Sequence, residues 1–254
     1  MDIRIDSLVL EVTRRCNMCC PHCLRGDAEN MDADIDLIPQ IFEGITEVGT
    51  LTFSGGEPSL NTKYIMAVVD YVIEHGVRIN GCFVATNAKV YSQDLVDCVR
   101  RLWEASFRRQ KTMCSAAKWL RANSDECELD EFAIAVSGDP YHEEVPVENL
   151  VRYLRCGFFS DSKIDDGRFI ISRGRGKNLS HAYARDIRNL YIEADDSNLL
   201  VSEIYVSCNG ILTSDCDMPF EDVDELAPDD AGYIGAIGEG SPLFEVLLGK
   251  TISV

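Results

Sequence analysis

Four cysteines lie close together near the start of the chain, in the sequence CNMCCPHC at positions 16–23. Thiolates bind zinc and iron–sulfur clusters, and several of them in one short loop can converge on a single metal centre. A cluster of four irons usually takes four cysteines, so a loop that supplies three would leave one iron open to an outside ligand. The spacing therefore indicates a metal centre that can do chemistry as well as carry electrons.

Spacing alone leaves the choice of ligands open. Cys16, Cys20 and Cys23 are separated by three and then two residues, whereas Cys16, Cys19 and Cys23 are separated by two and then three. A structural zinc site is the main alternative to an iron–sulfur cluster. Such a site generally has a second Cys-x-x-Cys or histidine pair further along the chain, and none of that shape follows here.

Strand-like and helix-like segments alternate along the chain, which favours right-handed βαβ units and a parallel sheet. The apolar runs predict six strands, at 7–12, 51–53, 82–85, 132–136, 169–171 and 203–206. Polar or glycine-containing sequences follow several of them. Because the carboxyl ends of parallel strands meet at one edge of a sheet, we expect these loops to gather around the cysteines. They are Gly55-Gly56-Glu57-Pro58, Thr86-Asn87-Ala88 and Ser137-Gly138-Asp139, with Arg168, Arg173 and Arg175 around the fifth strand.

The spacing of Cys16, Cys20 and Cys23 resembles the cluster motif of the radical S-adenosylmethionine (radical SAM) superfamily, including the preceding Thr13. The resemblance implies that these three cysteines hold a 4Fe-4S cluster and that Cys19 is free. It also implies that S-adenosylmethionine binds the open iron. Reductive cleavage would give a 5′-deoxyadenosyl radical, which abstracts hydrogen from a substrate.

The resemblance also implies contacts between the other loops and the cofactor. His22 stands where Phe, Tyr or Trp is common, and we expect it to pack near the adenine. The backbone of Gly55, Gly56 and Pro58 and the carboxylate of Glu57 are expected around the methionine amino group. Thr86 and Asn87 are similar to a third family signature. Ser137 and Asp139 are expected at the cofactor carboxylate and ribose, and Arg168 or one of the two later arginines can grip the carboxylate. A plain turn or a helix N-cap is the alternative for several of these residues.

The resemblance implies a partial six-stranded parallel β/α barrel over residues 1–200, open on one side. Residues 201–254 are expected to form a small, loop-rich C-terminal extension with an Asn-Gly hairpin, an acidic loop and a short helix at 242–248. This extension is similar to the start of a SPASM or twitch domain. Two cysteines, Cys208 and Cys216, are too few for an auxiliary cluster. The polar stretch 105–128 is a candidate lid.

The charge and hydropathy of the chain limit the classes of partner that we expect it to bind. The chain has 24 basic and 43 acidic residues and a net charge of −19, which disfavours binding to nucleic acids and anionic membranes. No 18-residue apolar run and no secretory signal occur, so we expect a cytoplasmic protein. The expected partners are S-adenosylmethionine, an external electron donor, and a peptide or small-metabolite substrate. A non-enzymatic metal-binding or electron-transfer protein is the alternative function.

Overall fold

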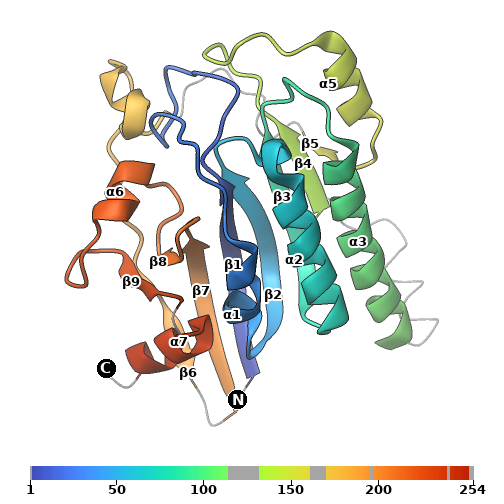
Figure 1. Cartoon of the computed structure of the whole chain (residues 1–254), viewed down its shortest axis with the longest axis vertical. Helices are drawn as coiled ribbons and strands as arrows, with labels where there is room; N and C mark the ends of the chain where they lie inside the picture. The colour runs from blue at the N-terminus through green and yellow to red at the C-terminus, as the bar shows by residue number, and fades with distance from the viewer. Residues whose placement is uncertain (1, 114–131, 161–169, 195–196, 239–240, 252–254) are drawn as a thin grey trace.

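The computed structural model describes residues 2–113, 132–160, 170–194, 197–238 and 241–251 (Figure 1). Within these residues the strands form one nine-stranded sheet, in which six parallel strands lie in the order β5-β4-β3-β2-β1-β7. Three antiparallel strands, β6, β8 and β9, are added on the β7 side. The strands are β1 (Asp2–Thr13), β2 (Ile45–Gly55), β3 (Arg78–Thr86), β4 (Phe132–Val136), β5 (Phe159–Ser160), β6 (Ile192–Ala194), β7 (Asn198–Val206), β8 (Ile211–Thr213) and β9 (Tyr233–Ala236).

Helices cover one face of the parallel strands (Figure 1). These helices are α1 (Ile38–Phe42), α2 (Thr62–Glu74), α3 (Gln93–Met113) and α5 (Val147–Leu154). Two further helices, α6 (Phe220–Glu225) and α7 (Leu243–Thr251), belong to the C-terminal part of the chain. Buried apolar side chains of α2 recur at helical spacing and pack with alternate residues of β1 in the main core. This packing fixes the positions of the strand ends, where the predicted site residues lie.

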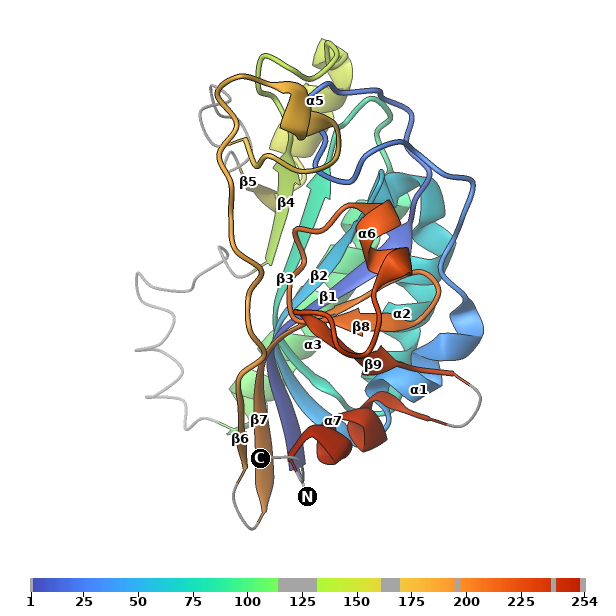
Figure 2. The ribbon, with the colours of Figure 1, turned by 90° about the vertical axis from the view of Figure 1, so that its left-hand side faces the viewer.

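The opposite face of the sheet is covered near β1 and β7 by the C-terminal part of the chain. Val9 and Tyr205 point to this face and pack with Met218 and Val223 in a second, smaller apolar cluster. Figure 2 shows α6 beside β8 and β9, the two strands that continue the sheet beyond β7. The C-terminal part therefore shares a core with the parallel strands, while the predicted domain boundary at residue 200 stays a prediction.

The structure confirms the predicted α/β fold with its six parallel strands, although one strand was misplaced. The fifth strand is Phe159–Ser160, not the predicted segment 169–171. Phe169 lies outside the described residues, and Ile171 forms an isolated bridge with Tyr183. Ile170 is buried without belonging to a strand, which shows that its apolar character reflects packing and not ladder formation.

The C-terminal expectations are largely met. A turn at residues 207–210 joins β7 to β8, with Gly210 at a φ of 84°, and α7 corresponds to the predicted short helix. Helix α6, within the acidic segment, was not expected. The predicted lid begins inside α3, and residues 114–128 lie outside the described part. None of the described helices combines the length and apolar character needed to cross a membrane.

Candidate cluster and cofactor site

The cysteine loop begins where β1 ends and lies against the loop that follows β2. The N–H of Gly56 donates to the carbonyl of Thr13 (2.7 Å), and the N–H of Glu57 donates to the carbonyl of Arg15 (2.8 Å). A Cβ atom on Gly55 would lie 2.1 Å from the Thr13 oxygen, and one on Gly56 would lie 2.3 Å from the Arg15 oxygen. Gly55 also has a φ of 128°. This approach of two backbones therefore requires glycine at both positions.

Three of the four clustered cysteines face the same space. Cys16, Cys20 and Cys23 line a cavity of about 150 Å³ that is also lined by Gly55 and Gly56. Cys19 is exposed and does not line this cavity. The spacing left two ligand sets open, and the structure places the set with Cys20, not the one with Cys19, around the cavity.

The number and placement of these thiols fit an iron–sulfur cluster, since three of them line one cavity. A tetrahedral zinc ion with Zn–S bonds of about 2.3 Å would bring its sulfurs to within about 3.8 Å of each other. In a four-iron cluster each cysteine binds a different iron, so the sulfurs stand further apart. The residues present therefore fit a 4Fe-4S cluster.

Burial raises the pKa values of Cys16 and Cys20 and so makes their thiolate forms unfavourable on their own. Burial raises the pKa of the Cys20 thiol to about 11, and the neighbouring sulfurs of Cys23 and Cys16 add to the effect. Burial likewise raises the pKa of Cys16. A metal centre supplies the positive charge that compensates three thiolates, so metal binding would be coupled to the release of their protons.

Glu57 has a role that its motif did not reveal. Its side chain is almost completely buried and accepts hydrogen bonds from the Thr86 hydroxyl (2.7 Å), the Asn87 N–H (2.8 Å) and the Ser59 N–H (3.1 Å). The carboxylate thus ties the end of β2 to the end of β3. It also lines the cavity, so the predicted contact with the cofactor amino group would be made by a carboxylate already held by three donors.

We expect Glu57→Gln to lower the free energy of unfolding by about 1–3 kcal/mol, because the amide replaces one acceptor oxygen by a donor that faces another donor. Urea unfolding of the cluster-free protein measures this change. Glu74→Gln, at an exposed position of α2, is the matched control and should change stability by less than about 0.5 kcal/mol. Equal effects of the two substitutions would contradict the role assigned to Glu57.

Asn87 connects the end of β3 to the cysteine loop. Its Nδ2 donates to Asn17 Oδ1 (2.8 Å) and lies 3.8 Å from the sulfur of Cys16. The next residue, Ala88, has a φ of 53°, in the region that favours glycine. Glycine would adopt this conformation with less strain than alanine.

Two histidines converge on Asp139 at the cavity wall. Asp139 Oδ2 lies 3.1 Å from His22 Nε2 and 2.9 Å from His142 Nδ1, and the two imidazole rings pack edge to face with centroids 4.6 Å apart. Both histidines line the cavity, together with Ser137. Sequence analysis missed His142, whose one available signal was its position three residues after Asp139.

The two predicted arginines that the structure describes do not line the cavity. Arg168 lies outside the described residues. Arg173 pairs with Asp215 (2.9 Å), and Arg175 donates to the carbonyl of Cys20 (3.0 Å) and to Asp27 (2.9 Å). Neither Arg173 nor Arg175 lines the cavity. Their guanidinium groups hold other parts of the chain in place.

Comparison with known proteins finds a match to an iron–sulfur domain. The model of a 4Fe-4S single cluster domain matches residues 7–124, which include the cysteine loop and the loops after β2 and β3. Residues 7–124 of this chain are therefore similar to a 4Fe-4S single cluster domain. This finding confirms the resemblance seen in the cysteine spacing.

Two curated relatives match part of this chain. The uncharacterized protein MJ0907 of Methanocaldococcus jannaschii is 28% identical over 99 residues, which are 37% of this chain and 35% of that protein. Protein YfkA of Bacillus subtilis is 32% identical over 85 residues, which are 30% of this chain and 23% of that protein. The matches therefore span about a third or less of these relatives.

Solved structures share the fold. The structure of anSMEcpe with bound AdoMet has a TM-score of 0.52 and 11% identity, over 96% of this chain and 80% of that chain. The structure of anSMEcpe with bound AdoMet and the Cp18Cys peptide has a TM-score of 0.51 and 10% identity, over 97% and 80%. Over nearly its whole length the chain thus shares a fold with a protein whose structures contain bound AdoMet.

Proposed function

We propose that this chain is a radical SAM enzyme whose 4Fe-4S cluster is held by Cys16, Cys20 and Cys23, with S-adenosylmethionine at the fourth iron. The observation that carries the proposal is the position of these three thiols around one cavity that the loop after β2 also lines, with Cys19 outside it. When bound, the cluster and the cofactor supply reductive cleavage to a 5′-deoxyadenosyl radical, which abstracts hydrogen from the substrate.

The protein's own residues would bind the cluster and the cofactor and orient them toward each other. The backbone of Gly55 and Gly56 lies at the cavity next to the cysteine loop, where it can approach the cofactor closely. Asn87 steadies the loop beside Cys16. His22 and Ser137 line the same wall, in keeping with the contacts expected for the adenine and the carboxylate. Thr86, Pro58 and Asp139 complete the proposed cofactor set, while the predicted contact of Arg168 stays a prediction.

We further propose a peptide as the substrate. Support comes from the fold shared with anSMEcpe, one structure of which contains a bound peptide. A small metabolite is the alternative substrate. A protein that only transfers electrons would not require a cavity beside the thiols, lined by a close-approaching glycine loop. An external electron donor and a cytoplasmic location belong to the same proposal.

The test is to assay cofactor cleavage by the reconstituted protein. After anaerobic reconstitution, dithionite and S-adenosylmethionine should give 5′-deoxyadenosine, and omission of dithionite should prevent its formation. A candidate peptide deuterated at the reacting position should transfer deuterium to the 5′-deoxyadenosine. A colourless, zinc-loaded protein that releases no 5′-deoxyadenosine would refute the proposed function.

A further inference from the structure

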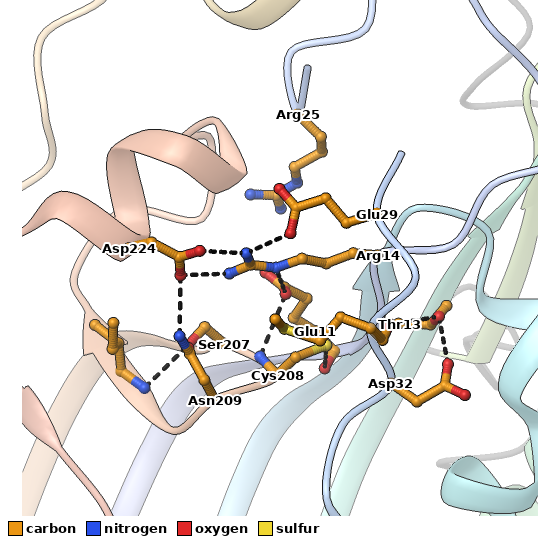
Figure 3. Close-up of polar contacts among 12 residues, drawn as sticks. Glu11, Thr13, Arg14, Arg25, Glu29, Asp32, Ser207, Cys208, Asn209 and Asp224 are labelled. Carbon is orange, nitrogen blue, oxygen red and sulfur yellow. Dashed lines mark hydrogen bonds and ion pairs between the residues drawn. The ribbon is translucent and has the colours of Figure 1, made fainter. Parts of the chain in front are cut away.

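Two buried arginines flank the cysteine loop, one on each side. Arg14 precedes Cys16 by two positions and Arg25 follows Cys23 by two positions. Arg14 is 0% exposed and Arg25 is 8% exposed. Figure 3 shows both side chains directed toward the C-terminal part of the chain. Both contact the same short segment, Met218–Asp224, which contains most of α6.

Arg14 binds α6 through hydrogen bonds to Asp224. Its Nη1 and Nη2 donate to the two oxygens of Asp224 (2.6 and 2.8 Å), a bidentate pair, while its Nε donates to Glu11 (2.6 Å) (Figure 3). Glu29, later in the loop, accepts from Nη1 as well (2.9 Å). Asn209 donates to Asp224 Oδ1 (3.0 Å) and holds this carboxylate from the other side. Charge-assisted bidentate pairs are among the strongest and most directional contacts in proteins.

Arg25 binds the start of the segment Met218–Asp224. Its Nη1 donates to the carbonyl of Met218 (2.8 Å), and its own carbonyl accepts from the N–H of Phe220 (3.1 Å). The Phe220 ring lies 4.9 Å from the guanidinium of Arg14 and 6.0 Å from that of Arg25. One aromatic ring therefore stands within cation–π distance of both arginines.

The cysteine loop needs such outside support, because residues 14–31 contain no helix or strand. Backbone contacts hold its base, where the N–H of Arg14 donates to the carbonyl of Met31 (2.8 Å) and that of Glu29 to the carbonyl of Arg14 (3.1 Å). The side chains of Arg14 and Arg25 extend this support to both ends of the cysteine-bearing part. In a loop without regular structure, the contacts of the side chains determine how closely each residue is held in position.

We propose that α6 is a clamp on the cluster loop, and that Asp224 and Phe220 are positioning residues that set the places of the three thiols. The inference rests on the proposed function for the cluster itself. The acidic C-terminal segment then acts on the metal site without contributing a ligand. The cysteines of the C-terminal part fit this role. Cys208 donates from its N–H to the Glu11 carboxylate (3.3 Å) and from its Sγ to the Glu11 carbonyl (3.4 Å), while the Sγ of Cys216 lies 3.9 Å from Arg188 Nη1.

The first arm of the test needs no cluster. Amide hydrogen exchange is measured on the cluster-free full chain for Asp224→Asn and Phe220→Leu, with Asp222→Asn as the matched control on the same helix, where residue 222 is exposed. We expect exchange in residues 14–31 to become about tenfold faster in the two test variants, with β1 to β4 unchanged. Unchanged exchange in the loop, or a uniform increase that includes the sheet, would overturn the clamp.

The second arm uses the reconstituted holoenzyme. Release of iron to a chelator should become about tenfold faster in Asp224→Asn and Phe220→Leu, and the electron paramagnetic resonance (EPR) spectrum of the reduced cluster should shift. Asp224→Glu should recover part of the wild-type behaviour, because it keeps the charge. Iron release and spectra identical to those of Asp222→Asn would overturn the clamp. A wild-type chain that binds no cluster would instead defeat the proposed function, and the exchange arm would still decide the clamp.

Discussion

Replacing Cys20 with alanine is expected to abolish cluster binding and reduce 5′-deoxyadenosine formation to the level of the cluster-free protein. The Cys20 sulfur lines the cavity together with those of Cys16 and Cys23, and with two thiolates left a second iron would lose its protein ligand. The measurements are iron and sulfide per chain after anaerobic reconstitution, and 5′-deoxyadenosine under dithionite.

Cys19→Ala is the matched control, since it removes the adjacent thiol of the same loop. Cys19 is exposed, and its sulfur lies 3.2 Å from Arg175 Nη1, outside the cavity. We expect this variant to keep its cluster and its cleavage activity. If Cys19→Ala lost the cluster and Cys20→Ala kept it, the proposed ligand set would be wrong, and the alternative spacing with Cys19 would apply.

Arg14→Met is expected to lower the free energy of unfolding by about 3–5 kcal/mol, because it leaves the buried carboxylate of Glu11 without its positively charged partner. The side chains of Arg14 and Glu11 are both 0% exposed. Burial alone would lower the pKa of Arg14, but hydrogen bonds and charges from Asp224 and Glu11 outweigh it and raise this pKa. Denaturant unfolding of the cluster-free chain measures the loss, which is a large share of a typical stability of about 5–15 kcal/mol.

Two further variants test which interaction accounts for the lower free energy of unfolding of Arg14→Met. Arg101→Met removes an exposed pair with Asp70 and should cost less than about 1 kcal/mol. Glu11→Gln combined with Arg14→Met should be more stable than Arg14→Met alone, because the uncompensated charge is then gone. A small effect of Arg14→Met, equal to that of Arg101→Met, would show that the buried ion pairs do not support the fold.

The sequence predicted best those features that depend on local patterns. The cysteine spacing and the Gly55-Gly56 pair are readable because a cluster loop and a close backbone approach each need particular residue types at adjacent positions. The strand Phe132–Val136 was predicted with its correct ends because both faces are buried and the run is continuously apolar. The fifth strand was misplaced because buried Ile170 gives the same apolar signal without pairing.

What the sequence did not predict depends on contacts between distant segments. Arg14 and Asp224 are 210 positions apart, and nothing near either residue indicates the other. Glu57 was assigned to the cofactor, although its partners Thr86 and Asn87 come from the next strand. The acidic segment was predicted to be a loop because most of its residues are charged. The two buried apolar residues of α6, Phe220 and Val223, are too few to give a helical pattern in the sequence.

The most direct test of the central claim is the EPR spectrum of the anaerobically reconstituted, dithionite-reduced chain, recorded with and without S-adenosylmethionine and combined with iron analysis. If three thiolates leave one iron open at the cavity, the chain should contain about four irons, and the spectrum should change when the cofactor is added. A protein with about one zinc, or a cluster whose spectrum is the same with and without the cofactor, would contradict the claim.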